Sequence, residues 1–182
     1  LMRSSAASDV YKRQIMNTPI DVCAKYIVVF LIFGAFLERT GISTFFIDLA
    51  NSIAGATAGG PAKVAVISSG LCGMVSGSSV GNTVTTGSVT IPMMKKTGYQ
   101  SEFAGAVEAA ASTGGQIMPP IMGAAAFLMA EYMGVSYAEV AYRALLPAIL
   151  YFVGIYIAVH LEAKKLGLKG IPTVSYTHLT LP

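Results

Sequence analysis

The longest stretch of the chain without a charged side chain covers residues 64–94 and contains 31 residues. Residues 109–130 and 144–161 form two further stretches of 22 and 18 residues without Asp, Glu, Lys or Arg. A helix that crosses a bilayer needs about 20 predominantly apolar residues. The expected fold class is therefore an all-α integral membrane protein with several transmembrane helices.

Composition excludes other classes. Only 12% of the 182 residues are charged, whereas soluble domains carry about 25%. High apolar content with a net charge of +3 argues against disorder. Lys and Arg are scattered and form no basic face, so no nucleic-acid partner is expected. The two cysteines, Cys23 and Cys72, give no metal-ligand spacing.

The two ends of the chain differ in character from the rest. Residues 1–14 and 173–182 are polar, rich in Ser or Thr, and lack hydrophobic periodicity. We expect them to be artefactual flanks, which are excluded from fold reasoning. Residues 15–172 are then expected to form a partial membrane domain.

The first half of this domain begins with an apolar helix expected over residues 22–37. In the next segment, residues 41–58, the apolar residues Phe45, Leu49 and Ile53 recur every four positions. This spacing predicts an amphipathic helix that lies in the membrane interface or against a neighbouring helix.

Residues 63–95 are expected to form a re-entrant helical hairpin. The middle of this segment is rich in Gly, Ser, Thr and Asn, which makes a poor straight helix. Lys63 precedes it and Lys95 and Lys96 follow it, and lysines gather on the cytoplasmic side of a membrane. A segment that starts and ends on the same side must turn inside the bilayer. We expect half-helices at 63–75 and 84–95 with a tip at 76–83.

A discontinuous span is expected over residues 101–133. Gly114 and Gly115 are followed closely by Pro119 and Pro120 near its midpoint. Proline lacks a backbone donor and clashes with the preceding helical turn. The expected half-helices are 101–113 and 121–133, and a last span follows at 142–160.

The hairpin tip and the broken span predict a binding site. Irregular backbone at membrane depth is tolerated only where it is buried in protein or lines a cavity, and it marks the site of secondary transporters. Neutral oxygens suit an alkali cation without the cost of a carboxylate at the bilayer centre. No acidic residue lies between Lys63 and Gln100, which argues against a proton relay built on hairpin carboxylates.

Other interpretations of these segments remain. Gly73, Gly77 and Gly81 form overlapping GxxxG patterns, which also serve close helix packing in a purely structural subunit. Gly77 to Gly81 also match the G-x-S-x-G elbow of a membrane-embedded serine hydrolase with Ser79 as nucleophile. Glu108 precedes the break by about two turns, and intramembrane ionisable residues usually mark functional pathways.

Several motifs carry a resemblance to a known family. They are GAFLERTG (34–41), GGPAKVAV (59–66), SGSSVGNTVTTGSVTIPMMKKTGY (76–99), FAGAVEAAASTGGQIMPPIMGAAAFLMAEY (103–132) and HLEAKKLGL (160–168). Because of these motifs, residues 33–167 resemble the large permease subunit of tripartite ATP-independent periplasmic (TRAP) transporters. The resemblance is closest to the type in which the small and large subunits are fused. Only one of the family's two inverted repeats is present, so the chain resembles an internal fragment that does not transport alone.

The resemblance implies an elevator-type, Na⁺-coupled secondary transporter in the bacterial inner membrane, with no other cofactor. It implies an organic-acid substrate such as a C4-dicarboxylate, a periplasmic solute-binding protein, and a small membrane subunit as partners. The implied Na⁺ ligands are Ser76, Ser78, Ser79, Asn82, Ser112, Thr113, Gly114 and Gly115. Substrate contacts are expected from Thr85, Thr86, Gln116 and Pro119. Another hairpin-containing sodium/dicarboxylate symporter, which needs no binding protein, is the alternative within transport.

Overall fold

The computed structural model describes residues 18–168 and residue 170. All regular secondary structure in this part of the chain is helical, which confirms the all-α prediction. The expected flanks, residues 1–14 and 173–182, lie outside the described residues. The elements in chain order are α2 (Thr18–Val22), a π-helical turn η1 (Cys23–Ile27), α3 (Val28–Arg39), α4 (Ile42–Ala54), α5 (Gly60–Ser76), α6 (Ser79–Lys96), α7 (Ser101–Gly115), α8 (Ala124–Met133) and α9 (Tyr137–Lys165).

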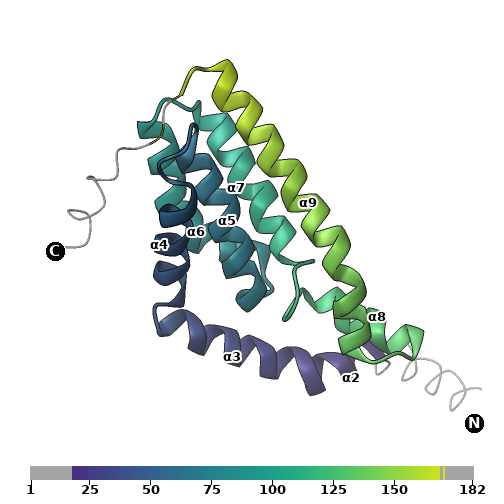
Figure 1. The fold of residues 1–182 in the computed structure, drawn as a ribbon. Coiled ribbons are helices and arrows are strands. Elements are labelled where there is room, and N and C mark those ends of the chain that lie inside the picture. The colour runs from purple at the N-terminus through teal and green to yellow at the C-terminus, as the bar shows by residue number, and fades with distance from the viewer. Residues whose placement is uncertain (1–17, 169, 171–182) are drawn as a thin grey trace, which may run out of the picture.

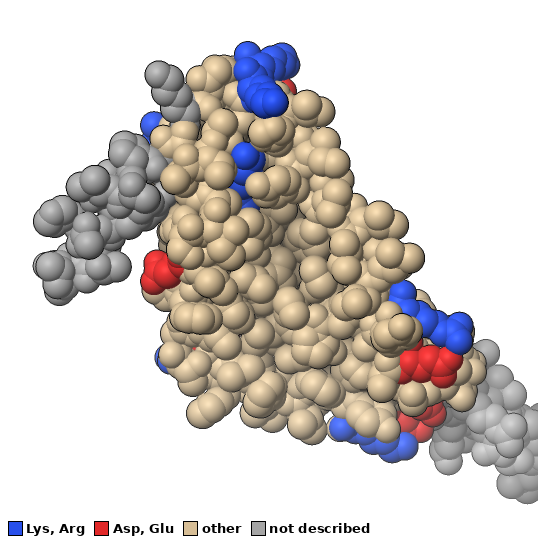
Figure 2. All heavy atoms as spheres, in the orientation of Figure 1, with Lys and Arg blue, Asp and Glu red and all other residues tan. Residues whose placement is uncertain are grey.

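Two helical segments of the described chain are long and apolar enough to cross a membrane. They are Ile20–Arg39, formed by the end of α2 with η1 and α3, and Tyr137–Lys165, which is α9. Only 11% of the most apolar window of each segment is buried inside the structure. On the face drawn in Figure 2, most charged side chains lie toward the two ends, and a broad uncharged area separates them. This distribution suits a helical membrane protein.

The core lies among α5, α6, α7 and α9. Helices α5, α6 and α7 pack side by side, with α4 against α5 and α9 on the opposite flank (Figure 1). Many of the residues buried there are small, which lets helix backbones approach closely. The central cluster contains Ala62, Ala65, Val66, Met94, Tyr99, Ala104, Val107, Ala111, Val159 and Ala163. Helix α3 runs across the end of these helices (Figure 1).

Helices α5 and α6 form a hairpin whose turn is tighter than the sequence predicts. The expected tip covered residues 76–83, but α5 extends to Ser76 and α6 begins at Ser79. Gly77 ends α5 in the left-handed conformation with φ of 61°. The Oγ atom of Ser78 accepts a hydrogen bond from the Gly81 backbone N–H at 3.2 Å. This N-cap lets α6 start at once, so residues 79–83 are helical and the wider tip is wrong.

The break between α7 and α8 is present and covers residues 116–123. Helix α7 continues through Gly114 and Gly115, two residues beyond the predicted end, and α8 begins at Ala124 instead of residue 121. The pair Pro119 and Pro120 lies in the middle of the break, as their effect on helical hydrogen bonding requires.

The remaining helices differ from the predictions mainly in length. The expected first helix at 22–37 is part of the longer segment Ile20–Arg39. The amphipathic segment 41–58 forms the shorter helix α4, which ends at Ala54. The last span, expected at 142–160, is the 29-residue helix α9. It begins at Tyr137 because the Oγ atom of Ser136 caps the Glu139 backbone N–H at 3.3 Å.

Candidate functional site

The turn of the hairpin and the break between α7 and α8 lie against each other. The Gln116 side chain in the break donates a hydrogen bond from Nε2 to the Ser79 Oγ atom at 2.9 Å. The Ile121 backbone N–H donates to the Met74 carbonyl oxygen at 3.3 Å. The two interrupted elements, which are about 40 residues apart in the sequence, therefore meet at one place in the fold.

Two glycines allow this contact to form between main chains. A Cβ atom built on Gly73 in α5 would lie 2.3 Å from the Gly115 Cα atom. A Cβ atom built on Gly115 would lie 2.6 Å from the Gly73 Cα atom. No side chain separates α5 from the end of α7 at this level, so the position of the turn is fixed directly by the backbone of α7.

A cavity of about 480 Å³ opens beside this contact. Its walls are the turn, the break, the start of α8 and the inner face of η1 and α3. The first turn of a helix leaves backbone N–H groups without an intrahelical partner and carries a partial positive charge. The start of α8 (Gly123, Ala124 and Ala125) and Ser78, the N-cap of α6, both line the cavity. Ile27, Phe30 and Phe127 give it an apolar side.

Asn82 lies one helical turn after the hairpin turn and is 1% exposed. Its Nδ2 atom donates to the Ser69 carbonyl oxygen at 2.7 Å. Its Oδ1 atom is buried and has no hydrogen-bond partner among the described residues. A buried amide oxygen without a partner is costly, which favours a ligand at this atom.

A second, very small cavity lies beside Asn82. Its volume is about 10 Å³, which is close to that of one water-sized sphere. Oxygen-bearing side chains form much of its wall, with Ile42, Cys72 and Val75 completing it. The oxygen-bearing residues are Glu38, Ser43, Ser76, Asn82 and Thr85.

The predicted Na⁺ ligands do not all converge on one point. Ser76, Ser78, Ser79 and Asn82 gather at the turn, and Gly115 lies against it. Thr113 is exposed and its hydroxyl donates to the Ala109 carbonyl oxygen of its own helix at 2.8 Å. Gly114 faces Tyr151 and Phe152 of α9. Ser112 is completely buried, and its hydroxyl donates to Glu108.

The predicted substrate contacts also divide into groups. Gln116 lines the larger cavity. Thr85 lines the smaller one. Pro119 lies within the break and is not among the residues that line either cavity. Thr86 is completely buried and donates to Glu108, so it faces the helix core.

Glu108 is the centre of a buried cluster of hydroxyl groups. Its carboxylate is 0% exposed and accepts hydrogen bonds from four side chains on three helices. The donors are Ser69 of α5 (2.7 Å), Thr86 and Thr90 of α6, and Ser112 of α7 (3.1 Å). Sequence reasoning singled out Glu108 but missed Ser69 and Thr90, because which hydroxyls face a carboxylate depends on the packing register of the three helices.

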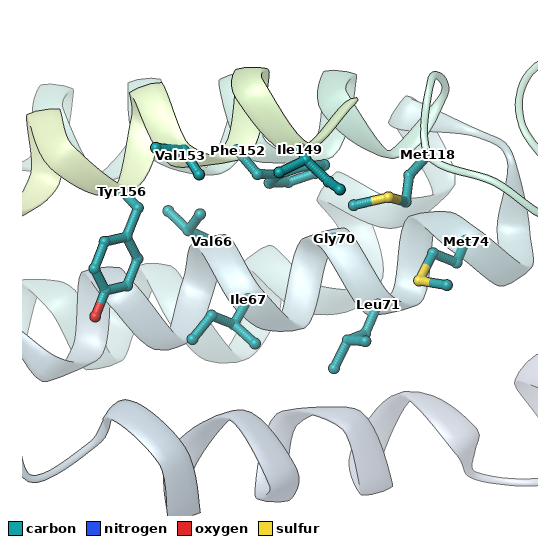
Figure 3. A pocket seen from close by; sticks show the side chains of 10 residues that line it. All are labelled: Val66, Ile67, Gly70, Leu71, Met74, Met118, Ile149, Phe152, Val153 and Tyr156. Carbon is teal, nitrogen blue, oxygen red and sulfur yellow. The ribbon is translucent and has the colours of Figure 1, made fainter. Parts of the chain in front are cut away.

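A third cavity lies between α5 and α9 and has a different character. It has a volume of about 340 Å³ and an almost wholly apolar lining. In Figure 3, Ile149, Phe152 and Val153 of α9 face Val66 and Gly70 of α5 across it. Apart from the Tyr156 hydroxyl its lining is apolar, whereas the cavity at the turn is bordered by Gln116, by serines and by two helix N-terminal ends, so the cavity at the turn is the candidate site for an organic acid.

A metal site and a serine hydrolase each require particular side chains among the described residues. Within the described residues no group of three or more His, Cys, Asp or Glu side chains could hold a metal ion. The hydrolase interpretation requires a histidine beside Ser79. The Ser79 hydroxyl instead accepts a hydrogen bond from Gln116, and His160 lies near the far end of α9.

Comparison with known proteins identifies the family. The family described as "Tripartite ATP-independent periplasmic transporter, DctM component" matches residues 1–180. The C4-dicarboxylate TRAP transporter large permease protein DctM of Pseudomonas aeruginosa is 30% identical over 146 residues, which is 80% of this chain and 34% of that protein. The corresponding protein of Vibrio cholerae is 29% identical over 147 residues, 81% of this chain and 32% of its own length.

Another relative is similar over a shorter region. The isethionate TRAP transporter permease protein DctMQ of Oleidesulfovibrio alaskensis is 34% identical over 111 residues, covering 60% of this chain and 18% of that protein. The chain thus spans about a third of the length of the large permease proteins it matches. It belongs to the DctM family of TRAP transporters, whose members are large permease subunits of secondary transporters and not enzymes.

Proposed function

We propose that this chain forms part of a Na⁺-coupled TRAP transporter that imports an organic acid across the bacterial inner membrane. A periplasmic solute-binding protein delivers the substrate, and a small membrane subunit, fused upstream, completes the assembly. The observation that carries the proposal is the direct contact between the hairpin turn and the break, with the Asn82 Oδ1 atom left unpartnered beside it. Helices interrupted at membrane depth with converging ends are typical of secondary transporters.

The chemistry at the turn suits Na⁺ as the coupling ion. Hard cations prefer oxygen ligands. The turn offers the hydroxyls of Ser76, Ser78 and Ser79 and the free amide oxygen of Asn82 within a short stretch of chain. Backbone carbonyls at the end of α7, near Gly115, supply further oxygens. Ser112 and Thr113 are left out of this ligand set because of their positions: Ser112 lies in the buried cluster around Glu108, and Thr113 is exposed with its hydroxyl on the Ala109 carbonyl oxygen of its own helix.

The larger cavity suits a small organic anion. The N-terminal ends of α6 and α8 border it, and such ends bind anionic groups through backbone N–H groups and the helix dipole. Gln116 adds a side-chain amide to the same wall. Two relatives are named for C4-dicarboxylate and for isethionate, both of them small organic anions. We propose an acid of this size class as the substrate.

The hairpin is proposed to enter the membrane and return on the same side. Lys63 lies near the start of α5, and Lys95 and Lys96 end α6. Lys164 and Lys165 lie at the end of α9 that packs against this region, as the positive-inside tendency favours for the cytoplasm. One repeat of an inverted-repeat fold, moving as an elevator, accounts for this arrangement.

The experiment that tests the function measures uptake by the full-length transporter in proteoliposomes. Radiolabelled organic acids are supplied with and without Na⁺, and with and without the binding protein. We expect uptake to require both components. Uptake that needs Na⁺ but no binding protein would favour a sodium/dicarboxylate symporter, and uptake that needs neither would contradict the proposal.

Asn82→Ala in the full-length transporter should raise the Na⁺ concentration for half-maximal uptake about tenfold or more, since a hydrogen-bonding group that meets a charge contributes about 1.5–3 kcal/mol. The measurement is the uptake rate against Na⁺ concentration at saturating substrate. Asn51→Ala is the matched control, because Asn51 also carries a buried, unpartnered Oδ1 atom but lies on α4. An unchanged Na⁺ dependence in Asn82→Ala would remove Asn82 from the ion site.

A further inference from the structure

The Glu108 carboxylate accepts hydrogen bonds from four hydroxyls but has no ion-pair partner among the described residues. Its Oε1 atom accepts hydrogen bonds from the hydroxyls of Ser69, Thr86 and Ser112, and its Oε2 atom accepts one from Thr90. All four donors are neutral. The described residues contain two ion pairs, Arg143 with Glu139 and Lys165 with Glu162, and neither includes Glu108. An ionised Glu108 at the centre of α5, α6 and α7 would therefore have no ion-pair partner among the described residues.

A short chain of contacts joins this charge to Asn82. The Ser69 hydroxyl donates to Oε1 of Glu108 at 2.7 Å, and the carbonyl oxygen of the same residue accepts from Asn82 Nδ2 at 2.7 Å. Thr86, which also donates to Oε1, lies one helical turn after Asn82. The Glu108 carboxylate and the Asn82 side chain are thus linked through one residue of α5, by way of the Asn82 Nδ2 atom.

We infer that Glu108 is the buried counter-charge for the coupling cation, acting on the ion from a distance without binding it. This inference rests on the proposed Na⁺ coupling. A cation held by hydroxyl, amide and carbonyl oxygens is a buried positive charge, and burial of an unpaired charge is costly. The charge of Glu108 lowers that cost for the cation, and the cation lowers the cost of burying Glu108. Glu108 is therefore a positioning residue, which stabilises the bound cation through its charge and is not one of the cation's ligands.

Two further observations favour Glu108 over the other carboxylate near this place. Gly87 of α6 makes room for Glu108, because a Cβ atom there would lie 3.0 Å from the Glu108 Cγ atom. Glu38 lines the small cavity beside Asn82 but is exposed at the end of α3, whereas Glu108 is enclosed by protein on all sides. A fully buried charge is screened much less.

The test measures Na⁺ binding directly on the purified full-length transporter. The readouts are ²²Na⁺ binding at equilibrium and the rise in unfolding temperature with Na⁺ concentration, with K⁺ keeping the ionic strength constant. Glu108→Gln keeps the shape of the side chain and removes its charge. We expect it to weaken Na⁺ binding about tenfold, as one unit charge acting across a few ångströms of protein interior does. Glu131→Gln makes the same change at an exposed position of α8 and should leave Na⁺ binding unchanged.

Glu108→Asp separates charge from shape. It keeps the carboxylate but shortens its reach to the four hydroxyls, so thermal stability should fall while Na⁺ affinity stays within about threefold of wild type. This variant also carries the test if Glu108→Gln does not reach the membrane. Unchanged Na⁺ affinity in Glu108→Gln, or a greater loss of affinity in Glu108→Asp or Glu38→Gln, would overturn the inference. Absence of Na⁺ binding in the wild-type transporter would instead contradict the proposed Na⁺ coupling.

Discussion

Gly115→Ala in the full-length transporter should abolish uptake. The new Cβ atom would lie 2.6 Å from the Gly73 Cα atom, which belongs to the main chain and cannot rotate away. It would also approach the Asn82 Nδ2 atom to 3.3 Å. Overpacking of this kind costs about 1–3 kcal/mol, and relieving it requires the hairpin to move away from the break. The measurement is initial uptake in proteoliposomes, normalised to the amount of reconstituted protein.

Gly105→Ala is the matched control on the same helix. A Cβ atom at Gly105 meets no heavy atom within 4 Å, and alanine is the better helix former, so uptake should be retained. Gly73→Ala approaches the same contact from the other side, with its Cβ atom 2.3 Å from the Gly115 Cα atom, and should reproduce the loss. Normal uptake by Gly115→Ala would show that the contact between the turn and the break is not required.

Gly59→Ala should lower the free energy of unfolding by about 3 kcal/mol, through a strained backbone and an overpacked contact together. Gly59 precedes α5 with φ of 69°, a left-handed conformation that disfavours a side chain. The added Cβ atom would lie 2.3 Å from the Ala163 Cβ atom and 2.6 Å from the Tyr99 Oη atom. The measurement is unfolding of the purified full-length protein in detergent, by heat or denaturant.

The Tyr99 hydroxyl that the new Cβ atom would approach stays protonated. Burial, with a smaller effect from Glu162, raises the pKa of Tyr99 to about 12, so the hydroxyl remains a donor to the Gly59 carbonyl oxygen at neutral pH.

Gly134→Ala isolates the backbone contribution, because Gly134 has φ of 64° and no heavy atom near its Cβ position. Gly134→Ala should lower the free energy of unfolding by about 1–2 kcal/mol. Equal losses in Gly134→Ala and Gly59→Ala would show that the contact with α9 contributes nothing.

Much of the architecture could be predicted because its causes are local. The uncharged stretches predicted helices, and the two glycines and two prolines after Thr113 predicted an interruption near the place where α7 ends. The length of the hairpin turn could not be predicted from composition, since it depends on a single side-chain cap at Ser78. Helix α7 extends past the predicted end because Gly114 and Gly115 pack against α9 and α5, which is a tertiary effect.

The candidate site could be predicted as segments but not as side-chain directions. The hydroxyls of Ser112 and Thr86 belong to segments that do meet, yet both donate to Glu108. Which way a hydroxyl points depends on how far one helix is rotated against its neighbour, and a single sequence carries little information on that rotation. Asn82 belongs to the predicted ligand set, but the unsatisfied oxygen that distinguishes it from the other members is seen only in the structure.

The Gln116 side chain both lines the larger cavity and donates to Ser79 at the turn. In the proposed transporter, the Gln116 amide group therefore lies beside both the cation site at the turn and the organic anion in the larger cavity. Linkage between two equilibria is reciprocal: if the anion tightens the binding of the cation by some factor, the cation tightens the binding of the anion by the same factor. In the proposed arrangement, cooperativity between the cation and the anion needs no relay through distant helices, because the hydrogen bond from Gln116 to Ser79 joins the wall of the larger cavity to a proposed cation ligand.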